Sequence, residues 1–444
     1  MTLNPATGAL EIDPLLDDPA TRIVVCCGSG GVGKTTTAAA LGLRAAERGR
    51  KVVVLTIDPA RRLAQSMGID SLDNVPRRVK GVEATGDAAG GELHAMMLDM
   101  KRTFDEIVEA HADGERAEAI LNNPFYQSLS AGFAGTQEYM AMEKLGQLRA
   151  RDTWDLIVVD TPPSRSALDF LDAPKRLGSF LDGKLIRVLM APAKVGGRAG
   201  MKFLNVGMSM MTGALGKLLG GQLLRDVQTF VAAMDTMFGG FRTRADATYK
   251  LLQAPGTAFL VVAAPERDAL REAAYFVERL AAERMPLAGL VLNRVHGSGA
   301  DRLSAERALA AAENLDERRI VDQTPGKEEV RTPPEPDPES ASEPVSESDQ
   351  PSEPVSDPAS GSPAAAENPA HLSTEQLTAG LLRLHAERMR LVAREQRTRD
   401  RFTALHPEVA VAEIAALPGD VHDLAGLRDI GDRLAAGGTP AGAE

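Results

Sequence analysis

The feature that most constrains the fold is a glycine-rich loop between an apolar run and an Ala-rich run. The apolar run, 23–27, has the composition of a short strand that is buried on both faces, as in parallel sheets. The Ala-rich run, 37–47, favours a helix that ends near Gly49. A glycine-rich loop that joins a strand to a helix predicts a phosphate-binding loop in an α/β fold. Its residues are Gly28, Ser29, Gly30, Gly31, Val32, Gly33, Lys34, Thr35 and Thr36.

The residue types of this loop suit the chemistry of nucleotide phosphates. Glycines let the backbone curl so that several N–H groups point at phosphate oxygens, and the helix N-terminus adds partial positive charge. We expect Lys34 to reach the β- and γ-phosphates of ATP and the Thr35 hydroxyl to hold Mg²⁺. The alternative, a glycine-rich turn with a chance lysine, leaves the flanking strand and helix without a role.

Two further apolar runs end in an aspartate, Asp58 after 51–57 and Asp160 after 156–159. The carboxyl ends of parallel strands meet at the edge of the sheet where α/β proteins place their chemistry. Asp160 is typical of a Walker B aspartate, which hydrogen-bonds the loop threonine or polarises a water on Mg²⁺. Asp58 taken alone is better explained as a helix N-cap, but its combination with Lys34 and Asp160 favours a catalytic role for all three.

These motifs together resemble one family of ATPases. Gly30 to Thr36, Asp58-Pro59-Ala60 and Asp160-Thr161 are similar to the deviant Walker A loop and the two switches of the arsenite-pump and tail-anchored-protein-targeting ATPases, most of all to actinobacterial members. The likeness covers roughly residues 20–300 and 373–435. It implies a dimeric ATPase of the P-loop class in which Asp58 positions the attacking water.

The same resemblance implies two contacts with adenine and a groove for clients. Asn293 and Pro418 occupy the positions at which the family contacts the base. Residues 180–245 contain seven of the 16 methionines together with many glycines, and the matching region of targeting ATPases forms a groove for a client's transmembrane helix. The alternative is a helical subdomain whose methionines fill its own core.

One position departs from the family pattern. The family usually has a lysine before the double glycine, which reaches across the dimer to the partner's nucleotide, whereas this chain has Ser29. A serine brings no positive charge, so the departure favours a heterodimer with a lysine-bearing paralogue over a homodimer. The competing hypothesis is a homodimer in which Arg61, Arg62 or Arg165 supplies the charge.

The expected fold is α/β, a mostly parallel, doubly wound P-loop NTPase sheet with an inserted Met/Gly-rich helical subdomain. Residues 321–370 carry net charge −10 of the chain's −12 and 11 of its 27 prolines, which predicts a disordered acidic linker. The rest is near neutral, so no nucleic-acid partner is expected. The predicted domains are a flexible tail (1–20), an ATPase domain (21–320, with helical subdomain at about 100–150 and 175–250), a linker (321–372), a closing helix and strand (373–437) and a second tail (438–444).

The cysteines and the hydropathy pattern indicate in which cellular compartment the protein is expected. Cys26 and Cys27, the two cysteines, are neighbours on one predicted strand and therefore point to opposite faces, which makes them poor disulfide partners. With no export signal and no long uncharged apolar run, we expect a cytoplasmic protein, with peripheral membrane association left open.

Two functional hypotheses follow. The first is an ATPase that couples its nucleotide state to the binding or targeting of an apolar or membrane-related client. The second is a partition-type or regulatory ATPase that positions cargo on a membrane or nucleoid, for which stimulation of hydrolysis by DNA would be diagnostic. An arsenite pump is disfavoured because the chain lacks a cysteine cluster, and without Cys-x-x-Cys no zinc clasp can form.

Deletion of residues 333–369 tests the linker. We expect the melting temperature and the ATPase rate to stay nearly unchanged, because the entropy of closing a loop grows only slowly with its length. Thermal unfolding followed by circular dichroism, together with phosphate release, measures both. A Gly/Ser replacement of equal length is the control, and a large fall in melting temperature would show that the segment packs on the core.

Overall fold

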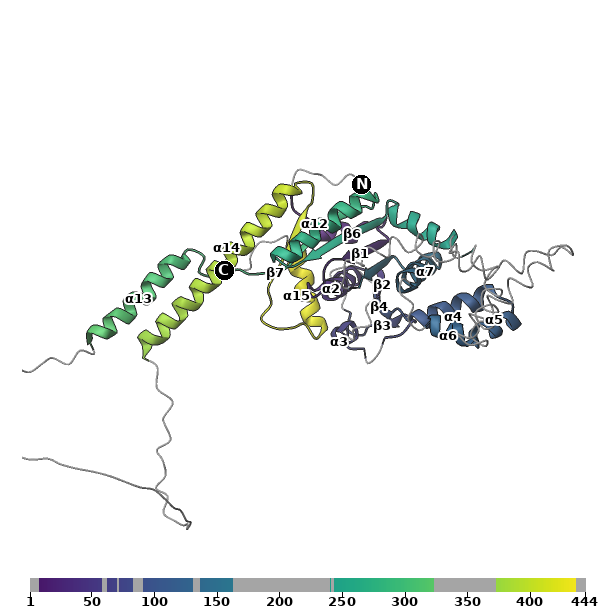
Figure 1. The fold of residues 1–444 in the computed structure, drawn as a ribbon, viewed down its shortest axis with the longest axis horizontal. Helices are drawn as coiled ribbons and strands as arrows, with labels where there is room; N and C mark the ends of the chain where they lie inside the picture. The colour runs from purple at the N-terminus through teal and green to yellow at the C-terminus, as the bar shows by residue number, and fades with distance from the viewer. Residues whose placement is uncertain are drawn as a thin grey trace, which may run out of the picture. The chain divides into compact units, whose positions relative to one another are not determined.

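The structure is a computed structural model in which helices and strands alternate along the chain, as in α/β proteins (Figure 1). It describes residues 8–57, 62–69, 72–82, 91–130, 136–162, 240, 243–322 and 373–436. The strands are β1 Ile23–Cys27, β2 Lys51–Thr56, β3 Arg77–Arg78, β4 Glu92–Met97, β5 Leu156–Asp160, β6 Thr257–Ala263, β7 Leu287–Val295 and β8 Val411–Ala415. The helices are α1 Ile12–Asp17, α2 Lys34–Glu47, α3 Arg62–Ser66, α4 Met100–His111, α5 Gly114–Leu121, α6 Pro124–Ser130, α7 Thr136–Ala150, α12 Arg267–Ala282, α13 Ala305–Asp322, α14 Thr374–Leu405 and α15 Leu424–Ala435.

In this part of the chain the strands form one eight-stranded sheet in the order β3-β4-β2-β5-β1-β6-β7-β8. Neighbouring strands pair in parallel except β3, which is antiparallel to β4. The predicted mostly parallel α/β sheet is therefore confirmed. Of the helical subdomain expected at about 100–150 and 175–250, residues 175–239 lie outside the described residues, as do the linker residues 323–372.

Two hydrophobic cores lie on the two faces of this sheet, as the central strand β1 illustrates. Ile23, Val25 and Cys27 pack into one core, and Val24 and Cys26 pack into the other. Helices α1, α2, α3 and α15 contribute to the second core, while α4 to α7 contribute to the first. Both cysteines are buried and free, and they lie on opposite faces, as their adjacent positions predicted.

The N-terminal segment corrects one expectation. Residues 1–20 were predicted to form a flexible tail, but residues 8–20 are ordered against the core. Leu10 N donates to Val411 O at 3.0 Å and Val411 N donates to Gly8 O at 3.0 Å, so the segment pairs with the edge strand β8. Helix α1 then buries Ile12 and Leu16, whose spacing places both on one face of a helix.

Ion pairs attach α1 to the helix that follows the phosphate loop. Arg44 of α2 makes paired hydrogen bonds to Asp13, at 2.5 Å from Nε and 2.8 Å from Nη2. Arg48 pairs with Asp17 in the same way. The hydrogen bonds from Arg44 lower the pKa of Asp13, which favours the charged carboxylate in this pair.

The chain divides into two compact units, residues 1–299 with 392–444, and residues 300–391. In the second unit, α13 and the first part of α14 are joined by an ion pair between Arg383 and Asp316. His385 Nε2 also lies 2.7 Å from the Leu303 carbonyl oxygen. The remainder of α14 belongs to the first unit.

A truncation at Leu16 tests whether α1 belongs to the core. Leu16→Ala is expected to lower the free energy of unfolding by about 2–5 kcal/mol, because it leaves a cavity where a fully buried side chain stood. Urea unfolding measures the change. Glu11→Ala, at an exposed position just before the helix, is the control and should stay within about 0.5 kcal/mol of the parent. Equal stability of both variants would contradict the packing.

Candidate nucleotide-binding site

Two positions of the loop after β1 require glycine, Gly28 because a backbone carbonyl lies close and Gly33 because of its left-handed backbone conformation. Gly28 has φ +153°, and a Cβ there would lie 2.0 Å from the Val262 carbonyl oxygen at the end of β6. Gly33 has φ +93°, and its Cβ would lie 2.2 Å from Asn293 Nδ2. A side chain at either position would displace the loop from the sheet edge, so these glycines set the shape of the cradle that the sequence predicted.

Helix α2 begins directly after this loop. Its first helical bond runs from Thr37 N to Gly33 O at 2.9 Å. The N–H groups of the preceding turn have no acceptor inside the helix by geometry, and the helix dipole places partial positive charge there. Lys34 is buried, and its Nζ donates to the Ser29 carbonyl oxygen at 2.8 Å, so its ammonium group lies over the loop. The donors and the charge therefore fit a polyphosphate.

Asp160 joins the loop to the neighbouring strands. At the end of β5 it is fully buried, with Cys26 as its neighbour on β1 and Thr56 as its neighbour on β2. Thr35 Oγ1 donates to Asp160 Oδ2 at 2.7 Å, and Thr56 Oγ1 donates to the same oxygen at 2.9 Å. The structure thus brings together Thr35 and Asp160, the two residues predicted to serve Mg²⁺.

Thr56 was missed by sequence reasoning. The sequence shows a hydroxyl residue at the end of an apolar strand. That this hydroxyl would hydrogen-bond Asp160 depends on the order of strands in the sheet, which the sequence does not show. Asp58 lies outside the described residues, and its role stays a prediction. The chain that leads to it starts beside Asp160, because Ile57 N donates to the Asp160 carbonyl oxygen at 3.0 Å.

The two residues predicted to contact adenine lie in different surroundings. Asn293, near the end of β7, is buried, and its Nδ2 donates to the Val32 carbonyl oxygen at 2.8 Å. It therefore reaches the phosphate loop, although the contact shown is with backbone. Pro418 is exposed in the chain after β8. An adenine contact stays a prediction for both.

The two cysteines beside the loop have thiols of low reactivity. Burial raises the pKa of Cys27 to about 12, so the thiol stays protonated at neutral pH. Burial, and then the charge of Asp160, raise the pKa of Cys26 well above its usual value. Metal or arsenite binding needs thiolates, and these two thiols also face apart. Within the described ranges, no group of three or more His, Cys, Asp or Glu side chains is arranged to hold a metal ion.

Comparison with known proteins decides the family. A model of the anion-transporting ATPase family matches residues 21–320, which include the whole loop and Asp160. The chain belongs to this family. It is similar to "ATPase GET3" of Podospora anserina, with 26% identity over 319 residues that cover 69% of this chain and 84% of the relative. It is also similar to "ATPase get3" of Botryotinia fuckeliana, with 26% identity over 303 residues that cover 67% and 80%.

Membership of the anion-transporting ATPase family confirms the family resemblance and the ATPase activity inferred from the sequence. This ATPase combines the loop, the buried lysine and the buried aspartate at one edge of its sheet. In the part of the chain that the structure describes, no helix is long and apolar enough to cross a membrane.

Proposed function

We propose that the chain is a dimeric cytoplasmic ATPase that binds ATP with Mg²⁺ and couples its nucleotide state to an apolar or membrane-related client. The observation that carries the nucleotide chemistry is the shared hydrogen bonding of Thr35 and Thr56 to Asp160 Oδ2. This pairing of a loop hydroxyl with a buried carboxylate supports the proposal, because these are the groups that P-loop ATPases use to hold Mg²⁺ beside the phosphates.

Each residue has a distinct task in this proposal. The Lys34 ammonium turns from the Ser29 carbonyl oxygen to the β- and γ-phosphates. Thr35 would be a ligand of Mg²⁺, and Asp160, which accepts a hydrogen bond from Thr35, would hold it in place. When bound, Mg²⁺ neutralises charge that develops on the phosphate oxygens. Asp58, by its resemblance to the first switch, positions the attacking water.

The proposal of an apolar or membrane-related client has other support than the nucleotide site. The sequence resembles targeting ATPases, relatives are named ATPase GET3, and the stretch 180–245 is rich in methionine and glycine. Arsenite is not proposed as a substrate, because both cysteines are buried, face apart and stay protonated. No observation favours the partition-type alternative.

Two substitutions separate binding from hydrolysis. Lys34→Ala is expected to abolish ATP binding, because it removes the charge that holds the phosphates. Asp58→Asn is expected to retain binding and to stop turnover, because the amide keeps the shape but loses the charge that polarises water. Fluorescent-nucleotide titration and phosphate release measure the two steps. Lys80→Ala, an exposed lysine, is the control. Unchanged hydrolysis in Asp58→Asn would remove the proposed role of Asp58.

Substitution of Ser29 tests how the dimer supplies a positive charge to the nucleotide. The relatives found give no support to a heterodimer, so the experiment uses the chain alone. A missing cross-interface cation costs roughly 10³-fold or more in rate, and we therefore expect slow turnover that Ser29→Lys raises. Specific activity is measured against protein concentration, with molecular mass from light scattering. Robust activity that Ser29→Lys leaves unchanged and Arg61→Ala, Arg62→Ala or Arg165→Ala abolishes would assign the charge to that arginine in a homodimer.

A further inference from the structure

Ile57, the residue that follows β2, is held through both its N–H and its carbonyl group. Ile57 N donates to the Asp160 carbonyl oxygen at 3.0 Å, and Thr56 donates to the Asp160 carboxylate. Gln137 Nε2 donates to the Ile57 carbonyl oxygen at 2.9 Å. Because a peptide group is planar, this second contact restrains the plane of the peptide that follows Ile57. Gln137 and Asp160 therefore hold Ile57 through the peptide groups on its two sides.

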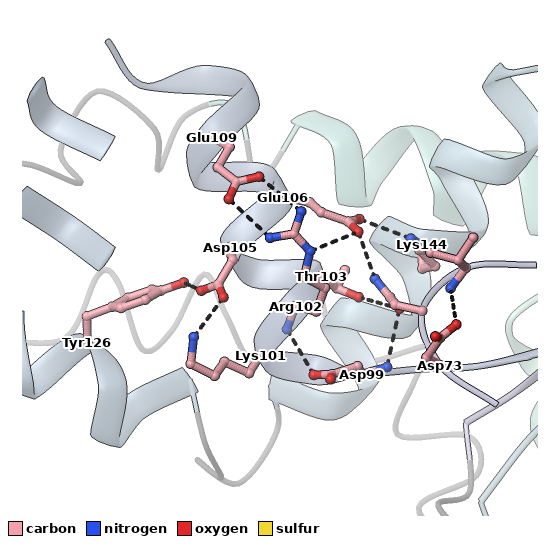
Figure 2. Close-up of polar contacts among 12 residues, drawn as sticks. Asp73, Asp99, Lys101, Arg102, Thr103, Asp105, Glu106, Glu109, Tyr126 and Lys144 are labelled. Atoms are coloured by element: carbon pink, nitrogen blue, oxygen red, sulfur yellow. Dashed lines mark hydrogen bonds and ion pairs between the residues drawn. The ribbon is translucent and has the colours of Figure 1, made fainter. Parts of the chain in front are cut away.

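Gln137 lies in the first turn of α7, and this helix is anchored by a partly buried ion pair. Lys144 Nζ of α7 lies 3.0 Å from Glu106 Oε2 of α4, and the lysine side chain is only 4% exposed. Figure 2 shows Lys144 pointing toward Glu106 across the space between their helices. Removing one partner of a buried pair leaves an uncompensated charge, so the pair strongly favours one placement of α7 against α4.

The Glu106 carboxylate is itself part of a polar network. Asn74 Nδ2 donates to Glu106 Oε1 at 3.2 Å, and Asn74 Oδ1 accepts from Thr103 Oγ1 at 3.1 Å and from Asp99 N at 3.2 Å. Asp99 caps α4 through the N–H of Arg102. In Figure 2, dashed lines mark these contacts around Thr103 and Asp99 and the contact of Glu106 with Lys144. The start of α4 and the chain before β3 are therefore fastened to α7.

A second ion pair, at Glu143, also attaches α7 to a neighbouring segment. Arg244 Nε donates to Glu143 Oε1 at 2.8 Å, and the glutamate side chain is 3% exposed. The Tyr139 hydroxyl donates to Glu143 Oε2 at 3.1 Å. Adjacent residues of α7, Glu143 and Lys144, thus bind partners from two different segments, Arg244 and Glu106. The amide of Gln137 extends from a helix whose position is fixed by several buried contacts.

We propose that Gln137 is a positioning residue for ATP hydrolysis, which acts by holding the Ile57 carbonyl and so the end of β2 beside Asp160. The inference rests on the proposed ATPase site and adds a residue outside it. Within the described residues, hydrogen bonds connect Thr35 to Asp160, Asp160 to Ile57, and Ile57 to Gln137 of α7. Gln137 itself contacts neither phosphate nor metal in this scheme, so its effect falls on turnover and not on ATP affinity.

The competing explanation is that Gln137 only satisfies a buried carbonyl group. Most buried carbonyl groups have a partner, and loss of the partner then lowers stability without a specific effect on hydrolysis. The two explanations differ in three measurable quantities, the melting temperature, the dissociation constant of ATP and the single-turnover rate.

The experiment compares Gln137→Met, which keeps the length but loses the donor, with Gln137→Glu, whose carboxylate cannot donate at neutral pH. Single-turnover hydrolysis with enzyme in excess measures the rate even if turnover is slow. We expect both variants to lose about tenfold in rate while the dissociation constant of ATP stays within about twofold. Gln147→Met, further along the same helix, is the matched control and should hydrolyse at the wild-type rate. Gln137→Lys, which restores a donor, should recover part of the rate.

Three outcomes decide the inference. Wild-type rates in both Gln137→Met and Gln137→Glu would overturn it. So would a parallel loss of ATP affinity, rate and melting temperature, which would indicate a structural contact alone. Failure of the proposed function is distinguishable, because then the wild-type chain itself would not hydrolyse ATP or Lys34→Ala would bind ATP normally.

Discussion

A single carboxylate oxygen, Asp160 Oδ2, connects the parts of the molecule that handle the nucleotide. A charge buried to this extent is stable only with hydrogen-bond partners, and two of them are hydroxyls from different elements. Thr35 belongs to the first turn of α2, and Thr56 is the last residue of β2. The hydrogen bonds to this buried carboxylate therefore hold the start of α2 and the end of β2 against β5.

The sheet order makes this meeting possible. β5 lies between β1 and β2, so the last residue of β5 has a neighbour on each side. Parallel pairing puts the carboxyl ends of all three strands at the same edge. Segments separated by more than a hundred residues in the sequence then meet within hydrogen-bond distance, as Thr35 and Asp160 do.

Two amide side chains brace this edge. Asn293 donates to the Val32 carbonyl oxygen in the phosphate loop, and Gln137 donates to the Ile57 carbonyl oxygen after β2. An amide satisfies a backbone carbonyl without the desolvation penalty that a lysine or arginine brings into such a place. The loop and the strand end are held by neutral amides, and the positive charge of Lys34 lies over the loop.

The sequence by itself determined the elements whose information is local. A glycine loop between a strand and a helix, and an apolar run that ends in Asp160, identify the phosphate-binding fold because each depends on a few consecutive residues. The prediction of a flexible tail was wrong for residues 8–20. The spacing of Ile12 and Leu16 is too short a pattern to predict a helix by itself, and the pairing with β8 is visible only in the structure. Thr56 and Gln137 were decided only by the tertiary structure. Their partners lie 104 and 80 residues away, and register and helix packing, which no local pattern records, bring them together.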